Sequence, residues 1–256
     1  MQLFEFTLIF SSLLICKSVT SRAFFVKNVD YIVGVFKYDL TTKDQVTFIS
    51  QGVLVSRNIV FTNSKNIEKD TNLKVRLYNW HKSRFINTNH KAEESDFEQR
   101  LATPDKFGIF REAKVVTLLL HEPFYNVKTI SNQGVSQNYL FDEDPKCILM
   151  KLKFKTKFSA RSVQEVFMKQ KEIKPHRNVR PYKCDSNFLS KLVESPEATD
   201  NYYCVDEVEK SHCNNHGGSA LVCQDRESPE SYFVAGVNVA NDNCKYIFEN
   251  VLVFKQ

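Results

Sequence analysis

The sequence predicts an all-β protein, either a sandwich or a barrel. From Tyr31 onward, short apolar or alternating stretches rich in β-branched and aromatic residues follow one another along the chain. Clusters of Asn, Asp, Ser, Thr and Lys separate these stretches about every 8–12 residues, the spacing of strands joined by turns. Helical periodicity is hardly visible anywhere in the chain.

Six strands are predicted in the first half of the chain. The first is apolar along its whole length, the fifth alternates apolar and charged residues, and the others are short runs of apolar residues. Their bounds are Tyr31–Phe36, Val46–Ile49, Val53–Val55, Ile59–Phe61, Leu73–Leu77 and Val115–Leu120. The polar and charged region His90–Arg111 is expected to form a long loop.

Length and composition describe a folded chain with one large β-rich domain or two small ones. The 256 residues are 42% apolar, with 35 Lys and Arg against 30 Asp and Glu, which excludes a disordered chain. No repeat or biased run supports a collagen, coiled-coil or low-complexity protein. Glycine is scarce, at 7 residues, against the roughly 18 that an average composition would give.

The N-terminal segment resembles a cleaved secretory signal. An apolar stretch from Phe6 to Cys16 is too short to span a membrane and is followed by small residues, among them Ser21 and Ala23. We therefore expect residues 1–21 to be a signal peptide and the protein to be secreted, without a membrane span. Six cysteines remain after cleavage, all in the C-terminal half, and an even number in a secreted chain predicts disulfide bonds.

The segment Cys204–Cys223 resembles the nucleophile region of the trypsin/chymotrypsin-like serine proteases. That region reads Asp-Ser-Cys-x-Gly-Asp-Ser-Gly-Gly-Pro-Leu-Val-Cys, and Cys213, Leu221, Val222 and Cys223 align with it without a gap. Further blocks resemble the same family in the same order along the chain. They are Gln51–Asn66, Leu120–Asn126, Ile148–Gln164 and Phe233–Cys244.

The resemblance implies the fold of this family, two six-stranded antiparallel β-barrels with the active site in the cleft between them. It places one such domain over residues 22–256, without most of the C-terminal helix, in a layout similar to single-domain insect members. The two cysteines that staple the histidine loop in the family are replaced by Ser50 and Asn66. The remaining implied disulfides are Cys147–Cys223, Cys184–Cys204 and Cys213–Cys244.

The positions that carry catalysis in this family read differently here. Ser-His-Asp catalysis needs a hydroxyl nucleophile, an imidazole base and a carboxylate that orients the base. The nucleophile position falls on Gly217, with Ser219 two residues beyond, and the base position falls on Lys65. The carboxylate position falls on Lys146 in one register and on Gln133 in another. Neither register gives a carboxylate, and a protonated lysine is no base, so we expect the protein not to be an enzyme.

Other cleft positions also depart from the family pattern. The Asp that pairs with the activated amino terminus is replaced by His216, and the oxyanion-hole glycine by Asn215. The base of the specificity pocket is Ser211, and the pocket wall begins at Val239. Such a cleft is expected to hold a protein segment without cutting it. The candidate binding residues are Lys65, Ser211, Asn215, His216, Gly217 and Val239.

A lysine-rich segment offers a second candidate surface. Lysines at every other position would place four ammonium groups on one face of a strand. They are Lys151, Lys153, Lys155 and Lys157. The pattern is typical of a solvated edge strand, and the alternative is a site for a sulfated glycan or anionic lipid heads. No cofactor, metal or nucleic acid is expected, because no basic-aromatic motif is present and the cysteines are assigned to disulfides.

The sequence therefore leads to the hypothesis of a secreted, non-catalytic serine protease homologue. The resemblance implies a cofactor, decoy or scaffold that binds a protease, an inhibitor or a receptor in extracellular fluid. Reproductive secretions are favoured over an immune cascade by analogy with small, diverged chains. The alternative is a glycosaminoglycan- or matrix-binding protein that uses the lysine-rich strand, and a peptidase with an unorthodox nucleophile is a third hypothesis.

Overall fold

The computed structural model describes most of the chain between Tyr31 and Leu252. The described residues are 31–38, 40, 46–65, 67–68, 72–78, 97–105, 114–132, 140, 147–150, 179–193, 200–206, 217–225, 227–228 and 231–252. The signal peptide expected over residues 1–21 and the lysine-rich segment 151–157 lie outside them. No helix in the described part has the length and apolar character that crossing a membrane requires.

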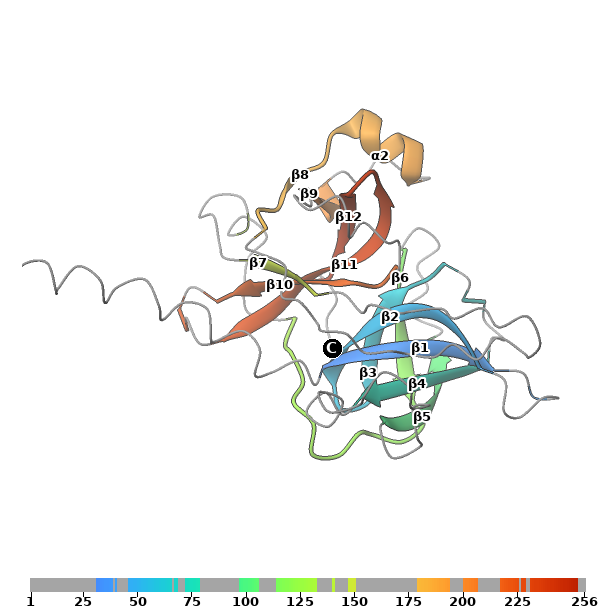
Figure 1. Cartoon of the computed structure of the whole chain (residues 1–256). Coiled ribbons are helices and arrows are strands. Elements are labelled where there is room, and N and C mark those ends of the chain that lie inside the picture. Colours follow the sequence, from blue (N-terminus) through green and yellow to red (C-terminus); the bar gives the residue numbers. More distant parts are fainter. Residues whose placement is uncertain are drawn as a thin grey trace, which may run out of the picture.

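The first six strands form a closed barrel, drawn in blue to green in Figure 1. The strand order around it is β1-β2-β3-β6-β5-β4, and neighbouring strands run antiparallel. The bounds are β1 Ile32–Tyr38, β2 Val46–Ser56, β3 Ile59–Asn63, β4 Leu73–Tyr78, β5 Phe97–Pro104 and β6 Val115–Leu120. Closure gives every strand two neighbours, so this barrel presents no sheet edge.

The next six strands form a second antiparallel sheet, in the order β7-β10-β11-β12-β9-β8. The bounds are β7 Cys147–Met150, β8 Tyr182–Lys183, β9 Tyr202–Asp206, β10 Ala220–Gln224, β11 Tyr232–Asp242 and β12 Lys245–Asn250. An isolated bridge between Cys147 and Val179 brings the chain just before β8 back to β7, so the sheet curls into a barrel-like shape. The predicted fold of two six-stranded antiparallel units is confirmed.

One continuous core joins the two units. Its members include Leu54, Leu118 and other buried side chains of the closed barrel. They also include Met150 of β7, Val222 of β10 and Val237 of β11. Apolar contact between the units holds them side by side, as Figure 1 shows, and fixes the geometry of the chain segments that meet between them.

The predicted loop His90–Arg111 is wrong in part, because it contains β5. Phe97–Pro104 pairs with β4 along six residues and with β6 at its end. Only Ala102 and Pro104 of this strand are fully buried, and its remaining side chains are polar or partly exposed. The β-propensity of these residues therefore does not predict β5, because pairing with β4 and β6 in the barrel, and not the composition of the segment, makes it a strand.

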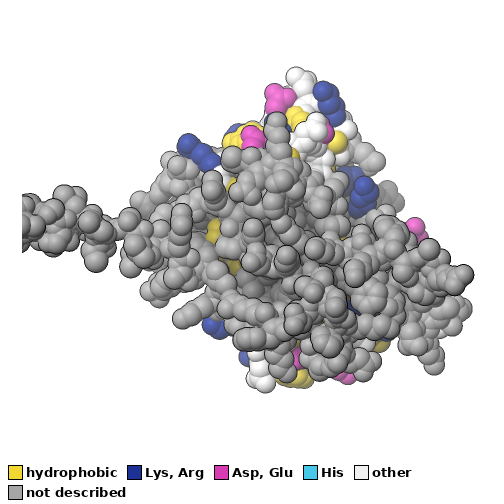
Figure 2. Space-filling view, viewed as in Figure 1, with side chains coloured by type: hydrophobic (Ala, Val, Ile, Leu, Met, Phe, Trp, Pro, Cys, Tyr) yellow, Lys and Arg dark blue, Asp and Glu magenta, His cyan; other side chains and the backbone are white. Residues whose placement is uncertain are grey.

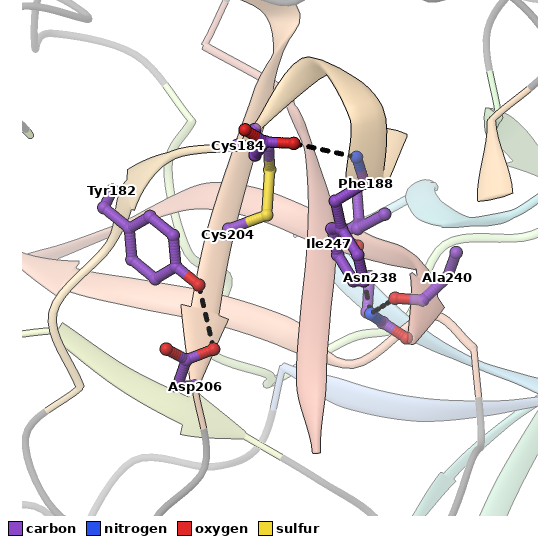
Figure 3. Close-up of a disulfide and its surroundings, with 9 residues drawn as sticks. Tyr182, Cys184, Phe188, Cys204, Asp206, Asn238, Ala240 and Ile247 are labelled. Atoms are coloured by element: carbon purple, nitrogen blue, oxygen red, sulfur yellow. Dashed lines mark hydrogen bonds between the residues drawn. A yellow bond between two sulfur atoms is a disulfide. The ribbon is translucent and has the colours of Figure 1, made fainter. Parts of the chain in front are cut away.

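A short helix covers the outer face of the second sheet. This helix, α2 (Ser186–Leu192), begins at Asp185, whose carboxylate accepts a hydrogen bond from the backbone N–H of Phe188. The disulfide Cys184–Cys204 ties the start of the helix to β9 (Figure 3). Leu189 of the helix is fully buried, in a cluster with Cys204 and Ile247. Sequence analysis did not predict this helix, since seven residues are too few to show a period.

The cysteines of the second sheet pair as the resemblance implies. Cys147 is bonded to Cys223, which links β7 to β10 where these two residues face each other in the ladder. Cys184–Cys204 is the second predicted bond that the structure contains. Cys244 is also disulfide-bonded, and its predicted partner Cys213 lies outside the described residues.

Candidate functional site

The two units meet where the middle of β2 and the end of β3 lie against the turn before β10. The backbone N–H of Gln51 donates to the carbonyl of Gly217 across 3.0 Å, and the Gln51 side chain donates to the carbonyl of Met150 across 2.9 Å. The turn is tied to β11 as well, because Gly218 N–H donates to the Asn238 carbonyl and Asn238 N–H to the Ser219 carbonyl, each across 2.8 Å. The position expected for the nucleophile therefore lies at the junction of the units.

Close contacts with the first unit explain the two glycines of this turn. Gly218 has a φ of +86°, and a β-carbon on it would run into the carbonyl of Gln51. Gly217 has no such backbone restriction, but a β-carbon on it would lie 2.6 Å from Nδ2 of Asn63. The space in front of Gly217 is thus occupied by a side chain from the other unit.

Asn63, the last residue of β3, is buried and hydrogen-bonded through both ends of its amide. Its Nδ2 donates to the carbonyl of Asn238 across 3.2 Å and to that of Val239 across 3.0 Å. Its Oδ1 accepts from the backbone N–H of Lys65 across 2.6 Å. Only 3% of Asn63 is exposed, so these contacts are made without water. Sequence analysis did not single out this residue, since an Asn in a Thr-Asn-Ser run resembles an ordinary turn residue.

Lys65 occupies the base position, and its side chain is exposed to solvent. An exposed ammonium is a cation at neutral pH and accepts no proton from a nucleophile. Beside it in the fold lies Lys114, because the backbone N–H of Ser64 donates to the Lys114 carbonyl across 2.7 Å. Lys114 directly precedes β6, which pairs with β3 up to Asn63. The backbone of Lys114 therefore lies beside the segment that carries Lys65.

The two positions predicted for the carboxylate are Lys146 and Gln133. Lys146 and Gln133 themselves lie outside the described residues. Their neighbours lie at the far end of β10, since Cys147 faces Cys223, whereas Met150 faces Ala220 near the turn. The chain before Gln133 also bridges there, with Ser131 opposite Phe233. The alignment that gave Lys146 matches Ile148–Met150 to the strand that follows the carboxylate in the protease family. This alignment fails because Ile148–Met150 belongs to β7 of the second sheet.

A carboxylate that sequence analysis missed approaches Lys114 from the second sheet. Glu249 of β12 accepts hydrogen bonds from the backbone N–H groups of Lys114 and Val115, each across 2.8 Å. Burial raises the pKa of Glu249 to about 7, against the opposing effects of the two hydrogen bonds and the charge of Lys114. The only signal in the sequence is a glutamate between Phe248 and Asn250 at the end of an apolar strand.

Val239, the predicted wall residue, lies at a β-bulge. Asn238 faces Phe248 and Ala240 faces Ile247, so Val239 is the extra residue of β11. The Asn238 amide stabilises this irregularity by donating to the carbonyls of Ala240 and Ile247, across 2.8 and 3.0 Å (Figure 3). The structure thus brings Lys65, Gly217 and Val239 together around Asn63.

Ser219, two residues beyond Gly217, is 3% exposed. Other predicted site residues lie outside the described residues: Ser211, Asn215, His216 and the four lysines of segment 151–157. On the face shown in Figure 2, the described Lys and Arg side chains are scattered and form no single patch. Among the described residues, no group of three His, Cys, Asp or Glu side chains is placed to hold a metal ion.

Comparison with known proteins supports the architecture. No protein-family model matches the chain, and no curated protein sequence matches it. A solved structure of GrC, granzyme C, a chymotrypsin-like serine protease, matches over 88% of this chain and 90% of its own, with a TM-score of 0.52 and 15% identity. The fold is trypsin-like. At this identity the likeness extends to the fold and not to the activity of the neighbour.

Proposed function

We propose that this trypsin-like chain is a non-catalytic binding protein that holds a protein segment in its cleft. One observation supports the proposal: Gly217 is expected at the nucleophile position and Lys65 at the base position, and we assign the carboxylate position to Lys114, whose carbonyl accepts from the N–H of Ser64 next to Lys65. A glycine supplies no hydroxyl to attack a peptide carbonyl, and two cations supply neither the base nor its orienting anion.

The energetic consequence of these replacements is large. In serine proteases, removal of a triad member leaves only about 10³–10⁴-fold acceleration over water, which comes from binding and the oxyanion hole. The oxyanion-hole position here is Asn215, which lies outside the described residues. A cleft without a nucleophile forms no acyl-enzyme, so its complexes with protein segments are reversible.

The geometry of β11 supports segment binding. Its pairing with β10 stops at Val237, opposite Ala220. From there to Asp242, β11 pairs only with β12 among the described strands. A sheet edge of this kind can take up an extended segment through main-chain hydrogen bonds. The half-buried Val239, Ala240 and Asn241 along this stretch would contact its side chains.

The proposed setting is extracellular fluid. Buried disulfides such as Cys147–Cys223 form and persist in oxidising compartments, which agrees with the expected signal peptide. The partner is a protease, an inhibitor or a receptor, for which this chain acts as cofactor, decoy or scaffold. Reproductive secretion is the setting that we favour, with an immune cascade as the lesser alternative.

Site-specific photocrosslinking in the native secretion tests this proposal. A photoreactive phenylalanine replaces Asn241 on the exposed end of β11, and in a matched control it replaces Tyr125, which is 60% exposed and lies by the β2–β3 turn. We expect a protein partner that is captured from position 241 and not from position 125. Equal capture from both positions, or none from position 241, would contradict binding at the cleft.

A further inference from the structure

The amide of Asn63 links the two units at the point where the reaction centre of this fold would lie. Two of its hydrogen bonds cross from β3 to β11, across 3.2 and 3.0 Å, and a third, across 2.6 Å, is a local bond from the backbone N–H of Lys65. We infer that Asn63 is an internal plug, which fills the place of a nucleophile side chain and fixes β3 to the bulge of β11. This inference concerns the joint between the units and holds whatever partner the chain binds.

Both donors of this amide and one lone pair of its oxygen are used. Both donors go to Asn238 and Val239, and the oxygen accepts from Lys65 N–H. A buried amide that makes three hydrogen bonds is costly to displace, because it would lose its partners and the Val239 carbonyl would lose this donor, whereas the Asn238 carbonyl would keep the N–H of Gly218. The Asn63 side chain therefore cannot swing aside to admit a larger residue at position 217.

Hydroxyl groups at the neighbouring strand ends reinforce the same joint. Ser50 Oγ donates toward the Gly217 carbonyl across 3.0 Å, and Thr62 Oγ1 lies 2.9 Å from Ser50 Oγ. Both side chains are fully buried. In the proteases that the sequence resembles, the position of Ser50 holds one of the two cysteines of a disulfide. Here that position takes part in a hydrogen-bonded network between the units. Asn63 makes a separate set of contacts, with Asn238 and the bulge residue Val239 of β11.

Because Asn63 fills this space, the side-chain size that position 217 tolerates depends on the residue at position 63. A methyl group at position 217 would meet three atoms of Asn63, namely Nδ2 at 2.6 Å, Cγ at 3.1 Å and Cβ at 3.2 Å. In Gly217→Ala the added methyl overpacks the joint, and we expect the thermal midpoint to fall by about 5–10 °C. In the Asn63→Ala background the same change fills the vacated space, and we expect a shift of less than about 2 °C.

A double-mutant cycle on the full mature chain measures this dependence. The four proteins are the parent, Asn63→Ala, Gly217→Ala and the double variant, and the readout is the thermal midpoint of each. Gly52→Ala is the matched control, because its β-carbon would meet Val60 at 2.6 Å and not Asn63. It should lower the midpoint equally in both backgrounds.

Every outcome of the cycle decides the inference. An equal loss from Gly217→Ala with and without Asn63 would overturn the plug. If Gly217→Ala does not fold, a folded double variant supports the plug, and an unfolded one overturns it.

A second substitution separates hydrogen bonding from filled volume. Asn63→Asp keeps the shape of the side chain, but an ionised carboxylate cannot donate to the carbonyls of Asn238 and Val239. We expect its midpoint, corrected for the parent at each pH, to lie lower at pH 8 than at pH 5, where a protonated acid can donate one bond. A difference from the parent that does not change between these pH values would show that Asn63 only fills space.

Discussion

The two six-stranded units of this chain achieve closure by different means. The first is a complete ring of hydrogen-bonded strands and contains no cysteine. The second is an open sheet whose ends meet only at the bridge between Cys147 and Val179, and all the described disulfides lie in it. The closed barrel is held together without disulfides. The open sheet carries its disulfides between strands that share only a few paired residues.

The largest expected effect follows from removing the disulfide that ties β7 to β10 within the second sheet. The Cys147→Ala/Cys223→Ala variant opens a connection between residues 76 positions apart. The chain-entropy model predicts a loss of about 4 kcal/mol in the free energy of unfolding. Hydrogen exchange followed by mass spectrometry should show lost protection in β7–β12 before β1–β6. Equal loss in both units would show that they unfold together and would break the comparison.

A smaller effect, dependent on pH, is expected at the contact between the units. Burial raises the pKa of Glu249 from 4.5 to about 7, so the folded chain binds a proton more tightly there than the unfolded chain does. Stability contributed by this group is therefore present at low pH and falls as the pH rises from about 4.5 to about 7. The ionised form costs up to about 3 kcal/mol above that range.

Glu249→Gln keeps an oxygen that accepts from the N–H groups of Lys114 and Val115 but carries no charge. We expect this variant to be more stable than the parent at pH 8 and closer to it at pH 5, as measured by denaturant unfolding. Glu227→Gln, at an exposed position of the second unit, is the control and should show no such difference. A constant gap between Glu249→Gln and the parent would contradict the assigned cause.

The helix over the second sheet should show an effect of about 1 kcal/mol. Asp185→Ala removes the carboxylate that accepts from Phe188 N–H at the start of α2. Asp185→Asn is the matched control, because asparagine also caps helices and should retain most of the stability. Denaturant unfolding measures both variants, and an equal loss in the two would show that the negative charge, and not the cap, matters.

An exposed ion pair of the same region should contribute least. Lys183 and Asp200 lie 3.3 Å apart with side chains that are 68% and 78% exposed. Solvent screening reduces such a pair to less than about 0.5 kcal/mol. Asp200→Ala should therefore leave the unfolding midpoint in denaturant within error of the parent. A loss of stability as large as that from Asp185→Ala would show that the contact between Lys183 and Asp200 stabilises the second sheet more than its exposure suggests.

The sequence allowed the fold to be predicted better than the site. Apolar runs such as Val115–Leu120 predict strands because a short run of β-branched and aliphatic residues indicates a buried strand whichever elements pack against it. The strand β5 and the helix α2 were missed, since tertiary neighbours and a single cap decide them. The disulfides Cys147–Cys223 and Cys184–Cys204 followed from the family resemblance.

The site was predicted only where a motif marked it. Gly217 and Lys65 stand in recognisable blocks, and the structure places both at the junction. Lys114 stands in no such block, and only the pairing of β3 with β6 brings it beside Lys65. Asn63 and Glu249 act through contacts between residues more than 130 positions apart, which no local pattern records.

The absence of a reactive nucleophile is the claim on which the proposed function depends most. Incubation of the purified mature chain with a serine-directed fluorophosphonate, followed by intact-mass measurement, tests it directly. Active trypsin in a parallel tube shows that the reagent is competent. We predict that the mass of this chain stays unchanged while trypsin is fully labelled. A stoichiometric mass increase that maps to one serine would contradict the account and identify a working nucleophile.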